Sequence, residues 1–250
     1  MTVKPGSFDV FNRDVEKNSG YLYTTNTRLS SMLATRNSVQ SVIAAGQFTG
    51  RRVVDVGCGD AHYSLQYWDS THPRSLTAID AAERAVALAN QRKGDRPITF
   101  VTGDSHRLPF ADNSFDVALL QAMLHHDDDP PQSIREAFRV APEVVIHEPN
   151  GCNLGLKIIE KLSRYHREHG ERSHTHWQLR DWVQQAGGEI VSCKFTGFVP
   201  MFCPDWIARS MKALEPAITA IPGLNIAGCA VYTIVARRRR HSNGPATSER

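Results

Sequence analysis

The chain has 250 residues, of which 41% are hydrophobic and 22% charged, and its formal net charge at pH 7 is +3. These values are typical of one large globular domain, or of a domain with a modest cap. Four positive charges come from Arg237 to Arg240, so the rest of the chain is close to neutral and lacks the basic face that nucleic-acid binding requires. No signal-peptide pattern and no run of about 18 apolar residues occurs, which predicts a cytoplasmic protein without a membrane partner.

The N-terminal part is predicted to be an arm followed by one helix. Residues 1–23 are polar and are interrupted by Pro5, Gly6 and Gly20. From residue 24 to residue 45, apolar side chains recur at helical spacing. We therefore expect an amphipathic helix before the first strand.

The most informative stretch is residues 53–64, VVDVGCGDAHYS. A β-branched apolar run stops at two glycines, Gly57 and Gly59, and helix-compatible residues follow, which predicts a strand, a tight turn and a helix. Glycines at such a turn allow positive φ and close approach of a ligand, and N–H groups at the helix start are free to face it. His62 stands where a dinucleotide-binding fingerprint has its third glycine, so the stretch predicts a nucleotide site but not one for NAD.

This stretch resembles motif I of the class I S-adenosylmethionine-dependent methyltransferases, an acidic residue followed by Gly-x-Gly-x-Gly. Asp55, Gly57 and Gly59 match it, and Ala61 replaces the third glycine, which adds a methyl group near the methionine end of the cofactor. The resemblance implies S-adenosyl-L-methionine as cofactor and S-adenosyl-L-homocysteine as product. It also implies that Asp55, Gly57, Cys58 and Gly59 bind the cofactor.

N-terminal helices often close over the active site in this family. The resemblance therefore implies that Tyr21 and Tyr23 lie near the cofactor or the acceptor. Packing of the two rings between the helix and the sheet is the alternative interpretation.

The second predicted strand, residues 76–79, ends at Asp80, 21 residues after Gly59. Nucleotide-binding α/β units place an acidic residue at this strand tip, where it accepts hydrogen bonds from ribose hydroxyls. An aspartate there can also cap the helix predicted over residues 81–91. We assign Asp80 and the adjoining Ala81 to the cofactor site.

A third strand is predicted over residues 98–101, and the Gly-Asp-Ser that follows resembles the family's acidic motif. By that resemblance Asp104 and Ser105 lie at the adenine of the cofactor. The stretch 108–120, LPFADNSFDVALL, closely resembles the small-molecule branch of the family, which includes quinone-ring methyltransferases.

Strand four is predicted to end at Gln121, and His125 and His126 follow shortly after it. Residues just beyond the carboxyl ends of parallel strands line the ligand crevice, so we place Gln121 at the cofactor and the two histidines near the methyl group. A histidine there can take a proton from an acceptor hydroxyl or amine. The alternative is that the histidines only cap the next helix or bind backbone.

No metal site is predicted. The run from His125 to Asp129 points its side chains in different directions, and Pro130 and Pro131 force an extended exit. The five cysteines show no Cys-x-x-Cys spacing, which also argues against a zinc site and against a disulfide framework.

The last third of the chain is predicted to complete the sheet and the acceptor pocket. Strand five, residues 144–148, ends at Glu148, the third catalytic candidate. Strands six and seven are expected over 189–198 and 226–235 as an edge hairpin. The connection between them is longer than a simple hairpin needs, which suggests a cap in which Met201, Phe202 and Trp206 line the acceptor pocket. Plain core packing of this segment is the alternative.

Together these features predict an α/β fold, a doubly wound Rossmann-like sheet with its ligand site at the switch point. The family implies seven strands in the order 3-2-1-4-5-7-6 with strand seven antiparallel. The predicted boundaries are an N-terminal arm (1–23), a methyltransferase domain (24–236) with a cap insertion (199–223), and a basic disordered tail (237–250).

The function implied is methyl transfer from S-adenosylmethionine to a small-molecule acceptor, with oxygen favoured over nitrogen and carbon. A nucleic-acid or protein methyltransferase is an alternative, but the near-neutral body and the lack of an Asn-Pro-Pro-Tyr-type motif after strand four disfavour it. A homologue that binds the cofactor without turnover is another. The expected partners are a small-molecule acceptor, no nucleic acid and no membrane, in a monomer or homodimer.

Overall fold

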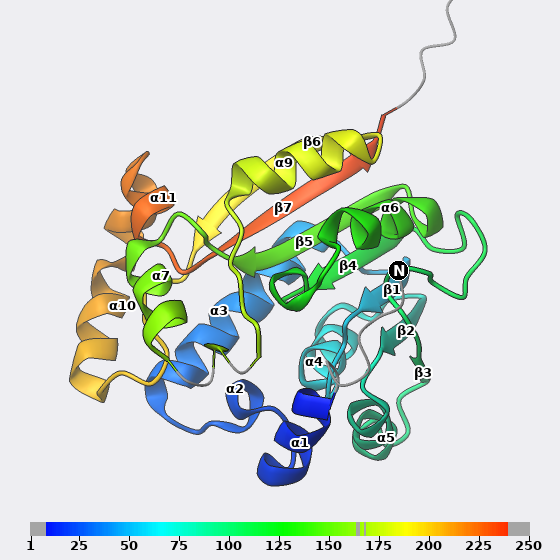
Figure 1. Ribbon diagram of the computed structural model, residues 1–250, viewed down its shortest axis with the longest axis horizontal. Helices are drawn as coiled ribbons and strands as arrows, with labels where there is room; N and C mark the ends of the chain where they lie inside the picture. Colours follow the sequence, from blue (N-terminus) through cyan, green and yellow to red (C-terminus); the bar gives the residue numbers. More distant parts are fainter. Residues whose placement is uncertain (1–8, 164–165, 168, 240–250) are drawn as a thin grey trace, which may run out of the picture.

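The computed structural model describes residues 9–163, 166–167 and 169–239. At its centre lies a seven-stranded sheet in the order β3-β2-β1-β4-β5-β7-β6 (Figure 1). Neighbouring strands pair in parallel except β7, which is antiparallel to both β5 and β6. The predicted fold class and strand order are confirmed. The strands are β1 (Arg52–Val56), β2 (Ser75–Asp80), β3 (Ile98–Thr102), β4 (Val117–Gln121), β5 (Glu143–Pro149), β6 (Gly188–Thr196) and β7 (Val231–Arg238).

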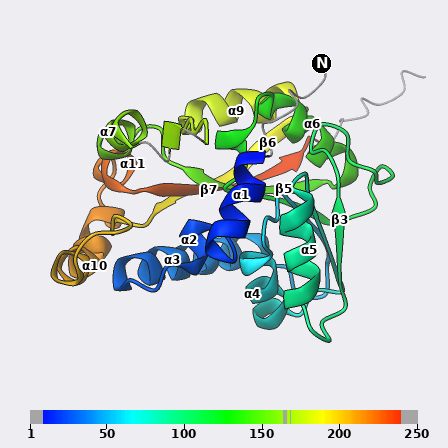
Figure 2. The same cartoon turned by 60° about the horizontal axis from the view of Figure 1, so that its bottom comes forward.

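Helices cover both faces of this sheet (Figure 2). Their bounds are α1 (Asp9–Asn18), α2 (Leu22–Thr25), α3 (Leu29–Gly46), α4 (His62–Thr71), α5 (Glu83–Arg92), η1 (Leu124–His126), α6 (Pro130–Val140), α7 (Leu154–Leu162), α9 (His176–Gln185), α10 (Asp205–Ala220) and α11 (Leu224–Gly228). Helices α3, α4 and α5 share one hydrophobic core with the sheet, and α6 and α9 share another on the opposite face. Within the described part of the chain, every helix falls short of the length and apolarity of a membrane span.

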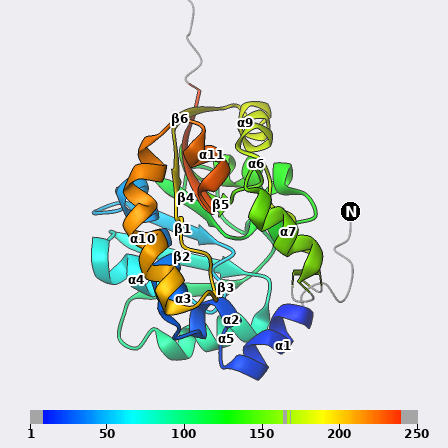
Figure 3. The same cartoon turned by 90° about the vertical axis from the view of Figure 1, so that its left-hand side faces the viewer.

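The central strands are buried on both faces, which explains their almost continuous apolar sequences. In the register, Val56 lies beside Ile79 on one side and Leu120 on the other. The carboxyl ends of β1, β2 and β4 are therefore level and form one edge. Helices α7, α10 and α11 stand at this end of the sheet, with α1 and α2 near them (Figure 3).

The prediction of an irregular N-terminal arm is wrong for the described residues. Residues 9–18 form α1, which packs on α5 through a small core of Val15, Ala82 and Ala85. The single helix expected from residue 24 is two helices, α2 and α3, with extended backbone at Asn26 and Arg28 between them. The sequence hides α1 because its mean polarity is high, and its few apolar residues face α5.

The C-terminal boundaries also differ from the prediction. The cap reaches beyond residue 223, because residues 224–228 form α11, which includes the first three residues of the strand expected over 226–235, and β7 begins only at Val231. Gly223 has φ of +87° and its N–H donates to Asn225 Oδ1, a turn that begins this helix. Strand β7 runs on to Arg238, so the tail cannot start at residue 237. Residues 240–250 of the predicted disordered tail lie outside the described residues.

Candidate active site

A cavity of 1710 Å³ lies over the carboxyl edge of the sheet. The turn after β1, the ends of β2 to β5, the N-terminal helices and the cap all contribute to its wall. The structure brings most of the predicted site residues together in this one cavity. These are Tyr21, Gly57, Cys58, Gly59, Asp80, Ala81, Asp104, Ser105, Gln121, His125, His126 and Glu148.

The glycines of the turn after β1 are required by space as well as by conformation. Gly57 has φ of +77° and Gly59 has φ of +55°. A Cβ on Gly59 would lie 2.4 Å from Tyr21 Cε2, and one on Gly57 would lie 2.6 Å from Met123 Cβ. Any side chain at either position would displace the wall of the cavity.

The backbone N–H groups of Gly57, Cys58 and Gly59 are bonded within the protein. The N–H groups of Gly57 and Cys58 donate to the Ile79 carbonyl, at 2.8 and 3.1 Å. The N–H of Gly59 donates to Asp80 Oδ2 at 2.8 Å. The turn therefore lets a ligand come close to the backbone, while its N–H groups hold β1 to β2.

Asp80 holds the turn and faces the cavity. Its Oδ1 accepts the N–H of Ala82 at 2.8 Å, and the N–H of Ala81 also bonds the carboxylate, which leaves it lone-pair capacity for a ligand. Burial raises the pKa of Asp80 above its ordinary value. The position suits the hydroxyl pair of a ribose, as predicted from its distance to the glycine motif.

Two predictions for motif I need correction. Asp55 is 2% exposed and lies outside the cavity wall; its Oδ2 accepts the Ser64 hydroxyl at 2.5 Å. Its carboxylate is therefore tied to α4 and does not face the cavity. The methyl of Ala61 is fully buried in the core shared with α3 and α4, away from the cavity, and Ala61 has φ of +65°, the conformation in which the family has glycine.

The N-terminal helices are fastened over the turn by Asp60, which the sequence analysis did not single out. Its buried carboxylate lies 2.7 Å from Arg92 Nη1 and accepts the Tyr21 N–H and the Thr24 hydroxyl. Arg92 also donates to the Ser19 carbonyl at 2.5 Å. These bonds hold the ring of Tyr21 against Gly59 and close one side of the cavity.

His125 and Glu148 form a buried pair on the other side. His125 Nδ1 lies 2.7 Å from Glu148 Oε2, and the N–H groups of Met123 and Leu124 each donate to Glu148 Oε1 at 2.8 Å. Burial lowers the pKa of His125 to about 3 and raises the pKa of Glu148 to about 7. Glu148 is completely buried, and both of its oxygens are bonded within the protein.

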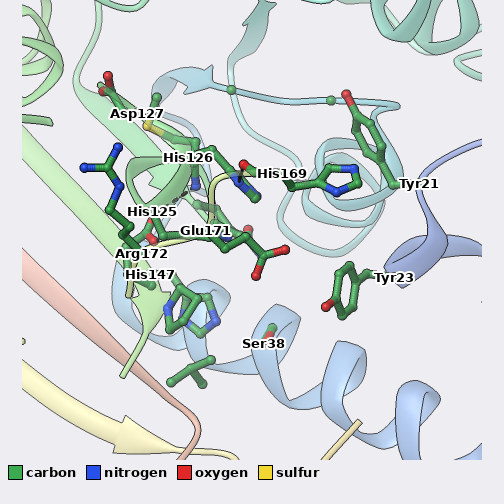
Figure 4. A pocket seen from close by; sticks show the side chains of 18 of the residues that line it. Tyr21, Tyr23, Ser38, His125, His126, Asp127, His147, His169, Glu171 and Arg172 are labelled. Atoms are coloured by element: carbon green, nitrogen blue, oxygen red, sulfur yellow. Dashed lines mark hydrogen bonds and ion pairs between the residues drawn. The ribbon is translucent and has the colours of Figure 1, made fainter. Parts of the chain in front are cut away.

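His126 lies against His125, with ring centroids 3.9 Å apart, and its Nδ1 is 3.3 Å from the His169 carbonyl. Burial lowers the pKa of His126 well below its ordinary value. Its ring also contacts Phe11 of α1 edge to face. These contacts favour a structural role in the wall between the N-terminal helices and η1 (Figure 4).

The remaining wall is mixed: polar side chains such as His169, Glu171 and Arg172 lie in it, and its apolar part comes from α7, the segment after β6 and α10. The apolar part includes Leu156 and Ile159 of α7, Phe198, Met201 and Phe202 of the segment after β6, and Met211 of α10. The prediction that Met201 and Phe202 line the pocket agrees with this geometry. Trp206 does not belong to the wall, because it points outward and is 71% exposed.

His147 is a cavity residue that the sequence analysis missed. It precedes Glu148 in β5 and therefore points to the opposite face of the sheet, toward α3. In Figure 4 its ring lies between His125 and Ser38 of α3. The sequence did offer a signal for His147. It is a polar residue near the end of the predicted fifth strand, and such a residue faces either the cavity or the core.

The described residues contain no group of three or more histidine, cysteine, aspartate or glutamate side chains that could hold a metal ion.

Residues 54–143 match the family described as "Methyltransferase domain". One relative is a demethylmenaquinone methyltransferase from Renibacterium salmoninarum, which is 33% identical over 47% of this chain and 48% of that protein. Another is the chloroplastic 2-methyl-6-phytyl-1,4-hydroquinone methyltransferase 2 of Oryza sativa subsp. japonica, which is 30% identical over 78% of this chain and 49% of that protein. Magnesium protoporphyrin IX methyltransferase from Synechocystis PCC 6803, solved with bound SAH, superimposes with a TM-score of 0.60 at 16% identity, over 94% of this chain and 95% of that one.

The chain contains a class I S-adenosylmethionine-dependent methyltransferase domain. The family predicted from motif I is thereby confirmed. The chain spans about half, or less, of the curated relatives that it matches.

The cofactor of this methyltransferase domain is S-adenosylmethionine. The residues present fit it: the turn at Gly57 and Gly59 leaves no side chain above β1, and Asp80 keeps free lone pairs for ribose hydroxyls. Asp104 and Ser105, predicted for the adenine, lie in the same wall. The individual cofactor contacts remain proposals.

Proposed function

We propose that this chain transfers the methyl group of S-adenosylmethionine to an oxygen of a small, largely apolar acceptor. The observation that carries the proposal is the shared cavity, whose wall contains both the Gly57–Gly59 turn with Asp80 and the His125–Glu148 pair. When bound, the cofactor supplies an activated methyl group on a sulfonium. The protein's task is to align the acceptor oxygen with that methyl carbon and to exclude water.

His125 is the residue that would take the acceptor's proton. Its Nδ1 is held by Glu148, so Nε2 is the ring nitrogen available to a ligand, and burial keeps the ring neutral at neutral pH. When the methyl–sulfur bond breaks and leaves its electron pair on sulfur, the hydroxyl proton of the methylated oxygen would pass to His125 Nε2. The Glu148 carboxylate then stabilises the imidazolium, as a carboxylate beside a catalytic histidine does.

Helix α7 and the cap supply the apolar part of the acceptor's surroundings. The side chains of Leu156, Ile159, Phe202 and Met211 face the cavity and offer no hydrogen-bonding group stronger than a thioether. A cavity of 1710 Å³ exceeds the usual range for a single small ligand, roughly 300–1,000 Å³, and so has room for the cofactor and a sizeable acceptor. Two relatives are named as methyltransferases of demethylmenaquinone and of 2-methyl-6-phytyl-1,4-hydroquinone, and these names support a sizeable, largely apolar acceptor.

The test is incubation of the purified protein and methyl-labelled S-adenosylmethionine with the small-molecule, protein and nucleic-acid fractions of the source cell. We expect label in the small-molecule fraction with wild type. His125→Ala should lose it, and His72→Asn, at an exposed histidine outside the cavity wall, should keep it. Label in protein or nucleic acid would overturn the proposal, as would cofactor binding without transfer to any fraction.

A further inference from the structure

Two buried nitrogen atoms in the cavity wall have no hydrogen-bond partner among the residues that the structure describes. They are Gln121 Nε2 and His147 Nε2. The two residues are 6% and 2% exposed, so bulk water does not satisfy these atoms. Buried polar atoms are nearly always paired, which makes two neighbouring exceptions in one cavity a sign of a missing ligand.

The sheet places the two side chains next to each other. Gln121 at the end of β4 is the register partner of His147 in β5. Their neighbours two positions earlier, Leu119 and Val145, both lie in the core under α3 and α4, so Gln121 and His147 share that face. His125 and Glu148 belong to the opposite face, and the cavity reaches both. Figure 4 shows His147 toward α3, on the same side of the cavity as His125 and across from Tyr23.

The partners of the two side chains decide what the free atoms can do. Gln121 Oε1 accepts the Tyr67 hydroxyl, which leaves the NH₂ group as a donor. His147 Nδ1 lies 2.8 Å from Thr233 Oγ1. The Thr233 hydroxyl has no other acceptor among the described residues, so we assign its hydrogen to Nδ1. His147 Nε2 then carries a hydrogen and is a second donor.

We propose that Gln121 and His147 form a donor pair that binds a carbonyl oxygen of the acceptor. The inference rests on the proposed function and narrows its substrate class to compounds with both a hydroxyl and a carbonyl group. Two N–H donors from adjacent strands match the two lone pairs of one sp² oxygen. Burial lowers the pKa of His147 to about 4, so the pair is neutral and suits a neutral oxygen better than an anion.

The cofactor's own carboxylate is the other source of sp² oxygen in this cavity. Gln121, which the sequence analysis places at the cofactor, ends β4 next to β1, whereas His147 lies two strands from β1, about 10 Å away at the usual strand spacing. The cofactor residues Gly57 and Asp80 lie just after β1 and at the end of β2. The distance of His147 favours the acceptor. The acceptor carbonyl and the cofactor carboxylate can be distinguished by measuring the affinity for each ligand separately.

The experiment compares two phenols that differ only in the carbonyl, para-hydroxyacetophenone and para-ethylphenol, titrated into the protein saturated with S-adenosylhomocysteine. Wild type should bind the ketone about tenfold more tightly, since one well-placed hydrogen bond to a buried donor is worth at least that factor. His147→Leu should lower ketone affinity to that of para-ethylphenol. Thr233→Val removes the hydroxyl that fixes the His147 tautomer and should reduce the preference for the ketone. Thr233→Ser keeps the hydroxyl and should retain that preference.

Equal binding of the two phenols by wild type, including no measurable binding of either, would overturn the inference. So would a ketone preference that survives in His147→Leu. A loss of S-adenosylhomocysteine affinity in His147→Leu would assign the donors to the cofactor carboxylate and overturn the acceptor assignment. Because these titrations measure binding alone, a failure of methyl transfer with an intact ketone preference would remove the proposed function and leave this subsite.

Discussion

His125 Nδ1 lies 2.7 Å from Glu148 Oε2, and the other oxygen of Glu148 is already held by two backbone N–H groups from the turn before His125. One carboxylate therefore fixes both the ring and the backbone that carries it. A proton added to the pair belongs to both residues, so its titration is a property of the pair.

The His125–Glu148 pair should make kcat for methyl transfer fall at acidic pH, which gives the pH profile an acidic limb. A proton already on the pair blocks removal of the acceptor's proton, so kcat should fall as pH drops below about 7, the value to which burial raises the pKa of Glu148. Glu148→Gln cannot titrate and should lose this limb, with kcat lower by about 10- to 100-fold. His125→Ala should lose about 10²-fold at all pH values while cofactor affinity stays unchanged. An identical pH profile in wild type and Glu148→Gln would contradict the role given to the pair.

Asp55 should make the domain less stable as pH rises. Burial raises its pKa from 3.8 to about 6 in the folded protein, so the folded state binds the proton more tightly than the unfolded chain does. The stability from this proton is complete below pH 3.8 and is lost as pH rises through about 6.

Asp55→Asn keeps an acceptor for the Ser64 hydroxyl and removes the titration. Its free energy of unfolding relative to wild type should increase between pH 4 and pH 6, by about 3 kcal/mol at most, and stay constant above that range. Denaturant melts at several pH values measure this difference. A difference that does not vary with pH would show that Asp55 is not the buried, titrating group described here.

Arg92 should be important for the N-terminal helices. Arg92→Met leaves the Asp60 carboxylate buried without its cation, which should cost about 3 kcal/mol of folding stability. Hydrogen exchange should also quicken in residues 19–25, whose backbone and side chains these two residues hold. The matched control is Arg96→Met, whose partner Asp69 is half exposed and whose loss should cost about 0–1 kcal/mol. Equal effects of the two variants would argue against a fastening role.

The sheet was predictable from sequence because its strands are short apolar runs that end in recognisable polar residues. Val53 to Val56 and Val117 to Leu120 are buried on both faces, so no polar alternation obscures them. Helix α1 was not predictable, because its stability comes from contact with α5 and not from an apolar pattern of its own. Residues 226–228 were misassigned to a strand for a similar reason: a turn at Gly223 and Asn225 decides their conformation, while their composition favours a strand.

The site divides in the same way. Gly57, Gly59 and Asp80 were predictable because backbone geometry and strand ends restrict the residue types that can occupy them. Asp60 and His147 were not, because their roles depend on partners 32 and 86 residues away, Arg92 and Thr233. Asp55 matched the motif, yet only the structure shows that its carboxylate bonds Ser64 and does not face the cavity.

The central claim is that the carboxyl edge of β1 and β2 binds S-adenosylmethionine, and calorimetric titration of the cofactor into wild type and Asp80→Ala tests it most directly. We predict one site per chain in wild type and affinity lower by about 10- to 100-fold in Asp80→Ala, because each lost charge-assisted hydrogen bond is worth about 1.5–3 kcal/mol. A melting curve of the variant without cofactor serves as the control for folding. No binding to wild type, or equal affinity in a folded Asp80→Ala variant, would contradict the account.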